Sequence, residues 1–66
     1  MRDRERIEEI IPLLQCIWRE YPDLRLGQLV SNLAVEAGKG HMDVFHVEDD
    51  DILIGIQKYL ERLKGG

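Results

Sequence analysis

The hydrophobic residues of the chain fall into three stretches in which they recur every three or four positions, as on one face of a helix. These stretches predict helices over about 3–20, 25–37 and 49–64. No strand pair and no internal repeat is visible in the pattern. We therefore predict an all-α fold, a small three-helix bundle in a single domain over 1–66, with an ordered loop over 38–48 between helices two and three.

Local signals mark where these helices begin and end. Asp3 is placed to cap the first helix, and Pro22 disfavours helical geometry at Tyr21, where that helix should stop. Pro12 lies inside the first stretch, and because the periodicity continues across it, we expect a kink there rather than a later helix start. Gly38 stands where a left-handed C-terminal cap requires glycine.

The predicted core is small and contains few large side chains. Trp18 and Phe45 are its largest members, and we expect Phe45 and Val47 to lie extended over the core and close the loop. Asp23 is placed to cap the second helix. Gly27, in the first turn of that helix, predicts either close approach of another backbone or a frayed start.

Length, charge and cysteine content exclude several classes of protein. A chain of 66 residues has a thin core, so support from a partner subunit or a metal is expected. Cys16 is the only cysteine, which excludes a disulfide within the chain and favours the cytoplasm. No apolar run is long enough for a signal peptide or a membrane span. A net charge of −4 argues against nucleic acid as a partner.

A run of acidic residues precedes the third apolar stretch. The run consists of Glu48, Asp49, Asp50 and Asp51. Carboxylates at this place cap free N–H groups and oppose the positive end of the helix dipole, so the run is typical of a helix start. The alternative interpretation is a metal site with mixed nitrogen and oxygen ligands. Its candidate ligands are His41, Asp43, His46 and Asp49. No cofactor is expected.

The chain carries more apolar residues than three helices can easily bury. Exposed apolar surface on a small protein usually marks a binding site for another protein. The candidate partner-binding residues are Leu13, Ile17, Trp18 and Ile54. For Trp18, core packing is the alternative to an interface role, and the two merge if the protein forms a homodimer.

Polar and turn residues cluster where the first helix gives way to the second. Pro22, Asp23, Arg25 and Gln28 either form a local turn motif or offer a recognition surface with Arg25 as donor. The second interpretation predicts a protein that sequesters a small anionic ligand, such as a nucleotide, between subunits. Its candidate ligand-binding residues are Arg25, Gln28, Lys39 and His46.

Many of these residues also carry a resemblance to a known family. The residues concerned are Arg6, Glu9, Leu13, Leu14, Gln15, Trp18, Pro22, Asp23, Leu26, Gln28, Leu33, Ala34, Glu36, Gly38, Asp50, Ile52, Leu53 and Ile54. With its W-x-x-x-P-D and G-Q-L elements, the chain resembles the YihD-like family of small bacterial proteins and similar short proteins of firmicutes and their phages. The resemblance implies a small helical fold and supplies no catalytic residues. Pro12 and the loop after Gly38 depart from the family pattern.

These observations favour a non-enzymatic module for protein–protein interaction. It would be cytoplasmic and homodimeric, encoded by a bacterium or a phage, and would bind through an apolar helix face. Catalysis would require a base beside a nucleophile in a pocket that excludes water, and a bundle of this size has little room for one. The alternatives are the anion-sequestering protein and the metal-binding protein.

Overall fold

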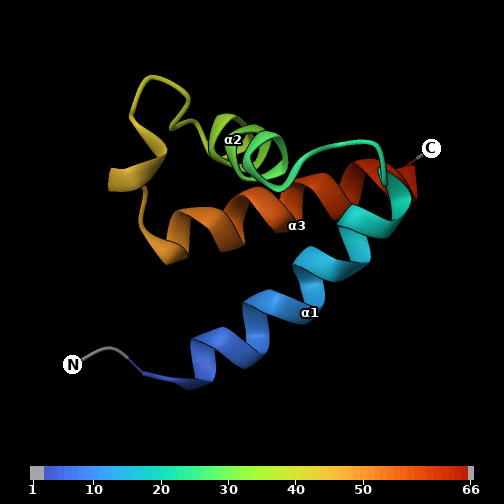
Figure 1. Cartoon of the computed structure of the whole chain (residues 1–66), viewed down its shortest axis with the longest axis horizontal. Helices are drawn as coiled ribbons and strands as arrows, with labels where there is room; N and C mark the ends of the chain where they lie inside the picture. The colour runs from blue at the N-terminus through green and yellow to red at the C-terminus, as the bar shows by residue number, and fades with distance from the viewer. Residues whose placement is uncertain (1–2, 66) are drawn as a thin grey trace.

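The computed structural model describes residues 3–65, which form three α-helices and one turn of 3-10 helix. In chain order these are α1 (Glu5–Glu20), α2 (Leu26–Glu36), η1 (Val44–His46) and α3 (Asp49–Gly65), as Figure 1 shows. No strand occurs between residues 3 and 65. The predicted all-α, three-helix fold is therefore confirmed.

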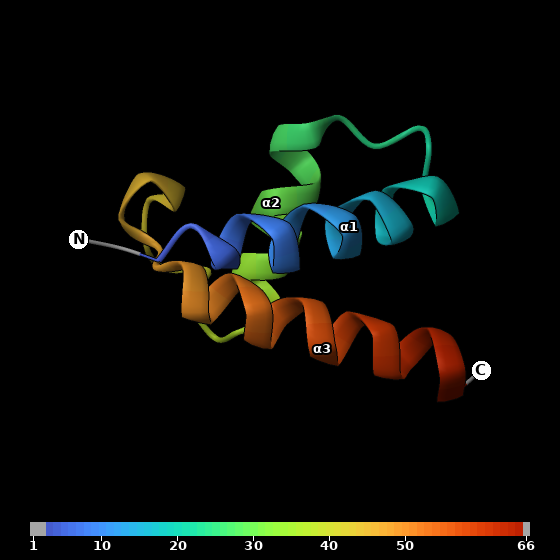
Figure 2. The same cartoon turned by 90° about the horizontal axis from the view of Figure 1, so that it is seen from below.

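Helix α3 is the element on which the other two helices pack. Both α1 and α2 contact it, while η1 packs against α2 (Figures 1 and 2). The core lies where the three helices meet and is apolar throughout. Its members are Ile17, Leu29, Leu33, Ala34, Ile52 and Ile56. A second layer of half-buried apolar side chains packs around this cluster.

The start of α1 and the end of α2 are fixed by the predicted local signals. The Oδ1 atom of Asp3 accepts a hydrogen bond of 2.9 Å from the N–H of Glu5, so Asp3 satisfies a free donor at the start of α1. Gly38 has a φ of +80°, and the N–H of Lys39 donates to the carbonyl of Ala34 at 2.8 Å. This is the glycine-dependent cap that satisfies carbonyl groups at a helix C-terminus.

Helix α1 continues without interruption through Pro12. A helix that begins only at Pro12 is therefore excluded, while the kink at this residue stays a prediction. The cap of α2 differs from the expectation, because the Oε1 atom of Gln28 accepts the N–H of Arg25 at 2.9 Å. The predicted capping role of Asp23 is taken by Gln28, which lies inside the first turn of the helix.

The acidic run forms the start of α3, as predicted. Asp49, Asp50 and Asp51 occupy the first turn of the helix, where carboxylates oppose its dipole. Asp49 also forms an ion pair with Arg6, which joins the start of α3 to the start of α1. The charges at this junction thus contribute to the docking of α1 on α3.

A close approach between two backbones occurs at Gly55, not at Gly27. Gly55 is buried in α3, and a Cβ atom at this position would lie 2.2 Å from the carbonyl oxygen of Leu33 in α2. A Cβ atom at Gly27 would meet nothing within 4 Å, so the prediction that another backbone approaches Gly27 closely is wrong. Glycine at position 55 lets α2 and α3 come closer than any residue with a side chain would allow.

The prediction that Phe45 packs over the core is also wrong. Phe45 is 86% exposed, whereas Val47 is half-buried against the core. The segment does not run extended but turns as a 3-10 helix over Val44–His46. With about three residues per turn, Phe45 and Val47 point in different directions, and only Val47 faces inward.

Candidate functional site

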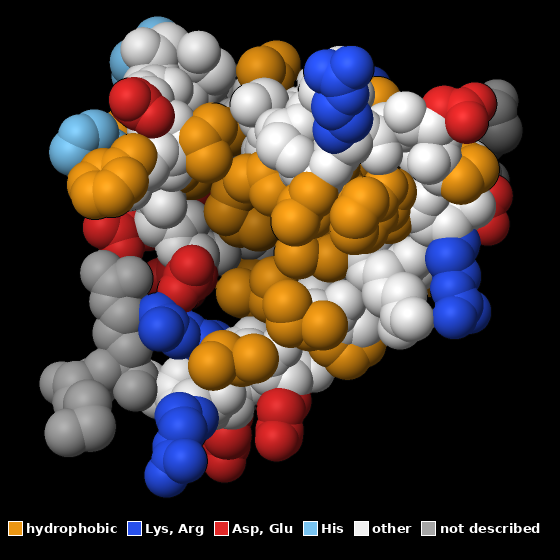
Figure 3. Space-filling view, in the orientation of Figure 1, with side chains coloured by type: hydrophobic (Ala, Val, Ile, Leu, Met, Phe, Trp, Pro, Cys, Tyr) orange, Lys and Arg blue, Asp and Glu red, His pale blue; other side chains and the backbone are white. Residues whose placement is uncertain are grey.

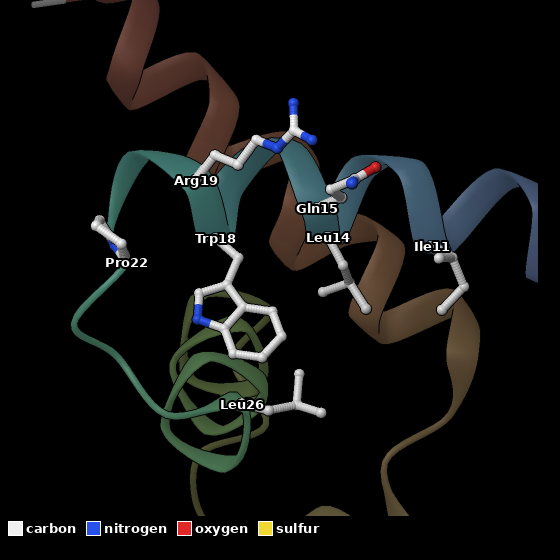
Figure 4. Close-up of a pocket in the computed structure, with 7 residues that line it drawn as sticks. All are labelled: Ile11, Leu14, Gln15, Trp18, Arg19, Pro22 and Leu26. Carbon is white, nitrogen blue, oxygen red and sulfur yellow. The ribbon is translucent and has the colours of Figure 1, made fainter.

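An apolar groove runs between α1 and the start of α2 (Figure 4). Its volume is about 590 Å³. The lining residues are Ile11, Leu14, Gln15, Trp18, Arg19, Pro22 and Leu26. A volume of this size is in the range of sites that hold small molecules or protruding side chains of a partner.

The spacing of apolar residues on α1 produces one wall of the groove. Ile11, Leu14 and Trp18 are separated by three and four positions and therefore lie on one stripe of the helix. Ile17 is fully buried against the core. The apolar surface of α1 is thus wider than the area that α3 covers, and the uncovered part faces the groove.

The opposite wall comes from the segment that reverses the chain. Pro22 follows the end of α1, and Leu26 is the first residue of α2. Figure 4 shows Leu26 pointing into the space into which Ile11, Leu14 and Trp18 project.

Trp18 is held in place by a hydrogen bond across the turn. Its Nε1–H donates to the carbonyl oxygen of Leu24 at 2.7 Å, which satisfies the polar atom of the indole. The side chain nevertheless remains 36% exposed, and its ring forms part of the groove wall. Trp18 therefore combines partial burial with the exposed position expected of an interface residue.

Exposure of large apolar side chains is pronounced at this groove. Ile11 is 55% exposed and Leu26 is 48% exposed. Figure 3 shows a continuous hydrophobic area on this face, over the region between α1 and α2. Such an area on a small protein is typical of a contact site for another macromolecule.

The polar side chains of the groove lie at its edge. Figure 4 shows Gln15 and Arg19 on α1 pointing away from α2, while Ile11, Leu14 and Trp18 point into the space beside Leu26. Among the described residues that line the groove, Arg19 is the one that carries a charge. The interior of the groove is therefore apolar and its rim is positively charged at Arg19.

The predicted partner-binding residues lie in different environments. Trp18 lines the groove, and Leu13 is half-buried against the core. Ile54 is 43% exposed on α3 but does not line the groove. The prediction that Ile17 contacts a partner is wrong, because its side chain is 0% exposed. The groove residues Ile11 and Leu26 were not predicted, although the width of the apolar stripe on α1 signals the first of them.

The predicted anion-binding residues do not meet within one chain. Arg25 precedes α2 and Lys39 follows it, and a helix of 11 residues separates them by roughly 16 Å. Gln28 is engaged as the cap described above, and His46 lies in η1. A single copy of the chain therefore forms no pocket that contains Arg25, Lys39 and His46 together.

The predicted metal ligands are not brought together either. Within residues 3–65, no group of three or more histidine, cysteine, aspartate or glutamate side chains could hold a metal ion. Asp49 pairs with Arg6, and the Oδ1 atom of Asp43 accepts the N–H of Phe45 at 3.0 Å. These two carboxylates therefore lie at the starts of α3 and η1.

Comparison with known proteins places the chain in a family. Residues 1–64 match the family model described as "Protein of unknown function (DUF1040)". The chain belongs to the DUF1040 family. Because the match begins before α1 and extends almost to the end of α3, the whole groove lies within the DUF1040 region. The narrower likeness to YihD-like proteins stays a prediction.

Neither the curated proteins nor the solved structures yield a match to this DUF1040 chain. Across the residues that the structure describes, no helix is both long and apolar enough to cross a membrane.

Proposed function

We propose that this DUF1040 protein is a non-enzymatic interaction module that binds an apolar segment of a protein in the groove between α1 and α2. The observation that carries the proposal is the exposure of Ile11 and Leu26 beside Trp18 in a groove of about 590 Å³. Large aromatic residues in such positions are frequent anchors of protein interfaces.

The energy available from this groove fits a reversible contact. Complete burial of an isoleucine or leucine side chain stabilises by about 1.5–3 kcal/mol. Ile11 and Leu26 are each about half exposed, so covering either of them contributes about 1 kcal/mol. Trp18 is 36% exposed and adds a further contribution, and association itself has a cost. A partner that covers the groove would therefore bind moderately rather than irreversibly.

The chemistry of the groove favours binding over catalysis. Among residues 3–65, those that line it include no aspartate, glutamate, histidine or serine, so this lining offers no pair of a nucleophile and a base. The anion-sequestering alternative would need Arg25 of one copy and Lys39 or His46 of another, because one copy keeps them apart. A cytoplasmic location remains part of the proposal, since Cys16 is the only cysteine.

Site-specific photo-crosslinking in host cells tests this function. A photoreactive phenylalanine analogue replaces Leu26 at the groove, and in a matched control it replaces Ile54, which is exposed on α3 outside the groove. We expect a discrete protein adduct from position 26 that disappears when Ile11→Glu is added. Equal adducts from both positions, or none from position 26, would refute the proposal.

A further inference from the structure

Phe45 is presented to solvent on an ordered turn. Its side chain is 86% exposed, although it is the only phenylalanine of the chain. The N–H of Phe45 donates to Asp43 Oδ1 at 3.0 Å, and the N–H of His46 donates to the carbonyl of Asp43 at 2.9 Å. The ring also contacts the imidazole of His46 edge-on, with 5.1 Å between ring centres.

An aromatic side chain held in this way is suited to insertion into a pocket. The turn already fixes its backbone, and a phenylalanine has only two rotatable side-chain bonds, so little conformational freedom is lost on binding. Phe45 is the most exposed of the large hydrophobic residues in the described part of the chain. Leaving it in water forgoes the burial that normally stabilises a phenylalanine.

The groove provides a site of matching character. It is lined by apolar side chains, and its volume of about 590 Å³ can accept an aromatic ring together with neighbouring side chains. The apolar area over α1 and α2 faces the viewer in Figure 3, and the turn η1, which carries Phe45, forms the left end of the molecule in the same view.

Opposite charges that could pair lie next to the two features. Arg19 lines the groove, and Arg25 immediately precedes Leu26 of the groove wall. Asp43 is exposed and lies two residues before Phe45, and one of its carboxylate oxygens is occupied by the turn. The second carboxylate oxygen is able to accept a hydrogen bond from a guanidinium group.

We infer that the groove is filled by the Phe45 turn of a second copy of this chain, in a reciprocal two-fold pair. The inference rests on the proposed function of the groove and names its partner. Each copy carries one projecting ring and one groove. In a pair related by a two-fold axis, the ring of each copy therefore occupies the groove of the other, and no ring or groove stays exposed. Asp43 of each copy then faces Arg19 of the other.

The first test is the mass of the protein by light scattering from micromolar to submillimolar concentration. We expect a monomer–dimer equilibrium in the wild type. Phe45→Ala removes two rings from the pair and should raise the dissociation constant roughly 100-fold or more. Ile54→Ala, the matched control at an exposed apolar residue of α3, should leave it unchanged. Because Phe45 is so exposed, its loss should not lower helicity measured by circular dichroism.

A mixing experiment tests the reciprocal arrangement. Phe45→Ala lacks the ring but keeps the groove, and Leu26→Glu blocks the groove but keeps the ring. Each variant alone should be monomeric, and the mixture should form a one-to-one heterodimer with one intact junction. Failure of the mixture to associate while the wild type dimerises would overturn the inference.

Further outcomes separate this inference from the proposed function. A monomeric wild type throughout the concentration range, a dimer that Phe45→Ala leaves intact, or open-ended oligomers would overturn the reciprocal pair. If position 26 then crosslinks to another protein in cells, the groove function survives with a different partner. If position 26 gives no protein adduct, the reciprocal pair and the proposed function of the groove are both refuted.

Discussion

The substitution Gly55→Ala tests the packing that holds the groove walls in position. A Cβ atom at this residue would lie 2.2 Å from the carbonyl oxygen of Leu33, and its next neighbours are also backbone atoms of Leu33. Ordinary contact begins at about 3.4 Å, so α2 and α3 would have to separate by about 1 Å. A backbone carbonyl in a helix cannot move away as the end of a flexible side chain can.

Two opposing terms set the magnitude. Alanine is favoured over glycine in a helix by about 1 kcal/mol, which would stabilise the variant. Overpacking a buried site costs about 1–3 kcal/mol and occasionally more, and separation of the helices also loosens the packing of Leu33 against Ile52 and Ile56. Because the clash is with backbone atoms, the steric cost should lie at the upper end of this range and outweigh the gain, with a net loss of about 2 kcal/mol. That is a large part of the roughly 3–5 kcal/mol expected for a core of this size.

Urea unfolding followed by circular dichroism measures this loss. All variants are compared at one protein concentration, because association would make their stability concentration-dependent. Gly27→Ala is the matched control, since a Cβ atom there meets nothing within 4 Å, and it should be neutral or stabilising by up to about 1 kcal/mol. The reasoning is refuted if Gly55→Ala is as stable as Gly27→Ala.

Three further substitutions test the core, a helix end and an ion pair. Ile17→Ala removes a fully buried side chain and should lower the free energy of unfolding by about 2–5 kcal/mol. Ile54→Ala, at an exposed site, should lower it far less. Similar losses for the two variants in urea unfolding would contradict the burial of Ile17. Gly38→Ala forces a residue with a side chain to a φ of +80° and should cost about 1 kcal/mol, and an unchanged melting temperature would argue against this cap. Arg6→Ala breaks an ion pair with Asp49 in which both side chains are more than a third exposed, so the loss should be at most about 1 kcal/mol and should vanish in high salt. A larger, salt-independent loss would show that Arg6 acts through packing.

The helices could be predicted because their signals are local. Apolar periodicity locates all three, Asp3 marks the start of α1, and Gly38 marks the end of α2. The acidic run before Ile52 likewise indicates the start of α3. Each of these signals depends on a few neighbouring residues and hardly on the rest of the fold.

The errors concern properties that depend on how the helices cross. Periodicity places Ile11 and Ile17 on one broad stripe, but only the packing of α1 on α3 decides that Ile17 is buried and Ile11 is exposed. Gly55 looks unremarkable in sequence, and its role appears once α2 lies against α3. Phe45 was misplaced because hydrogen bonding to Asp43 turns its segment, which hydrophobicity does not reveal.

Fluorescence of Trp18 tests the central claim most directly. It is the only tryptophan of the chain, it lines the groove, and 36% of its surface is accessible to solvent. If the Phe45 turn of a second copy covers the groove, dilution of the wild type from submillimolar to submicromolar concentration should shift the emission to longer wavelength and increase quenching by acrylamide. At every concentration, Phe45→Ala should show the longer emission wavelength and the stronger acrylamide quenching of the diluted wild type. Emission and quenching that stay constant on dilution of the wild type and match those of Phe45→Ala would contradict the account.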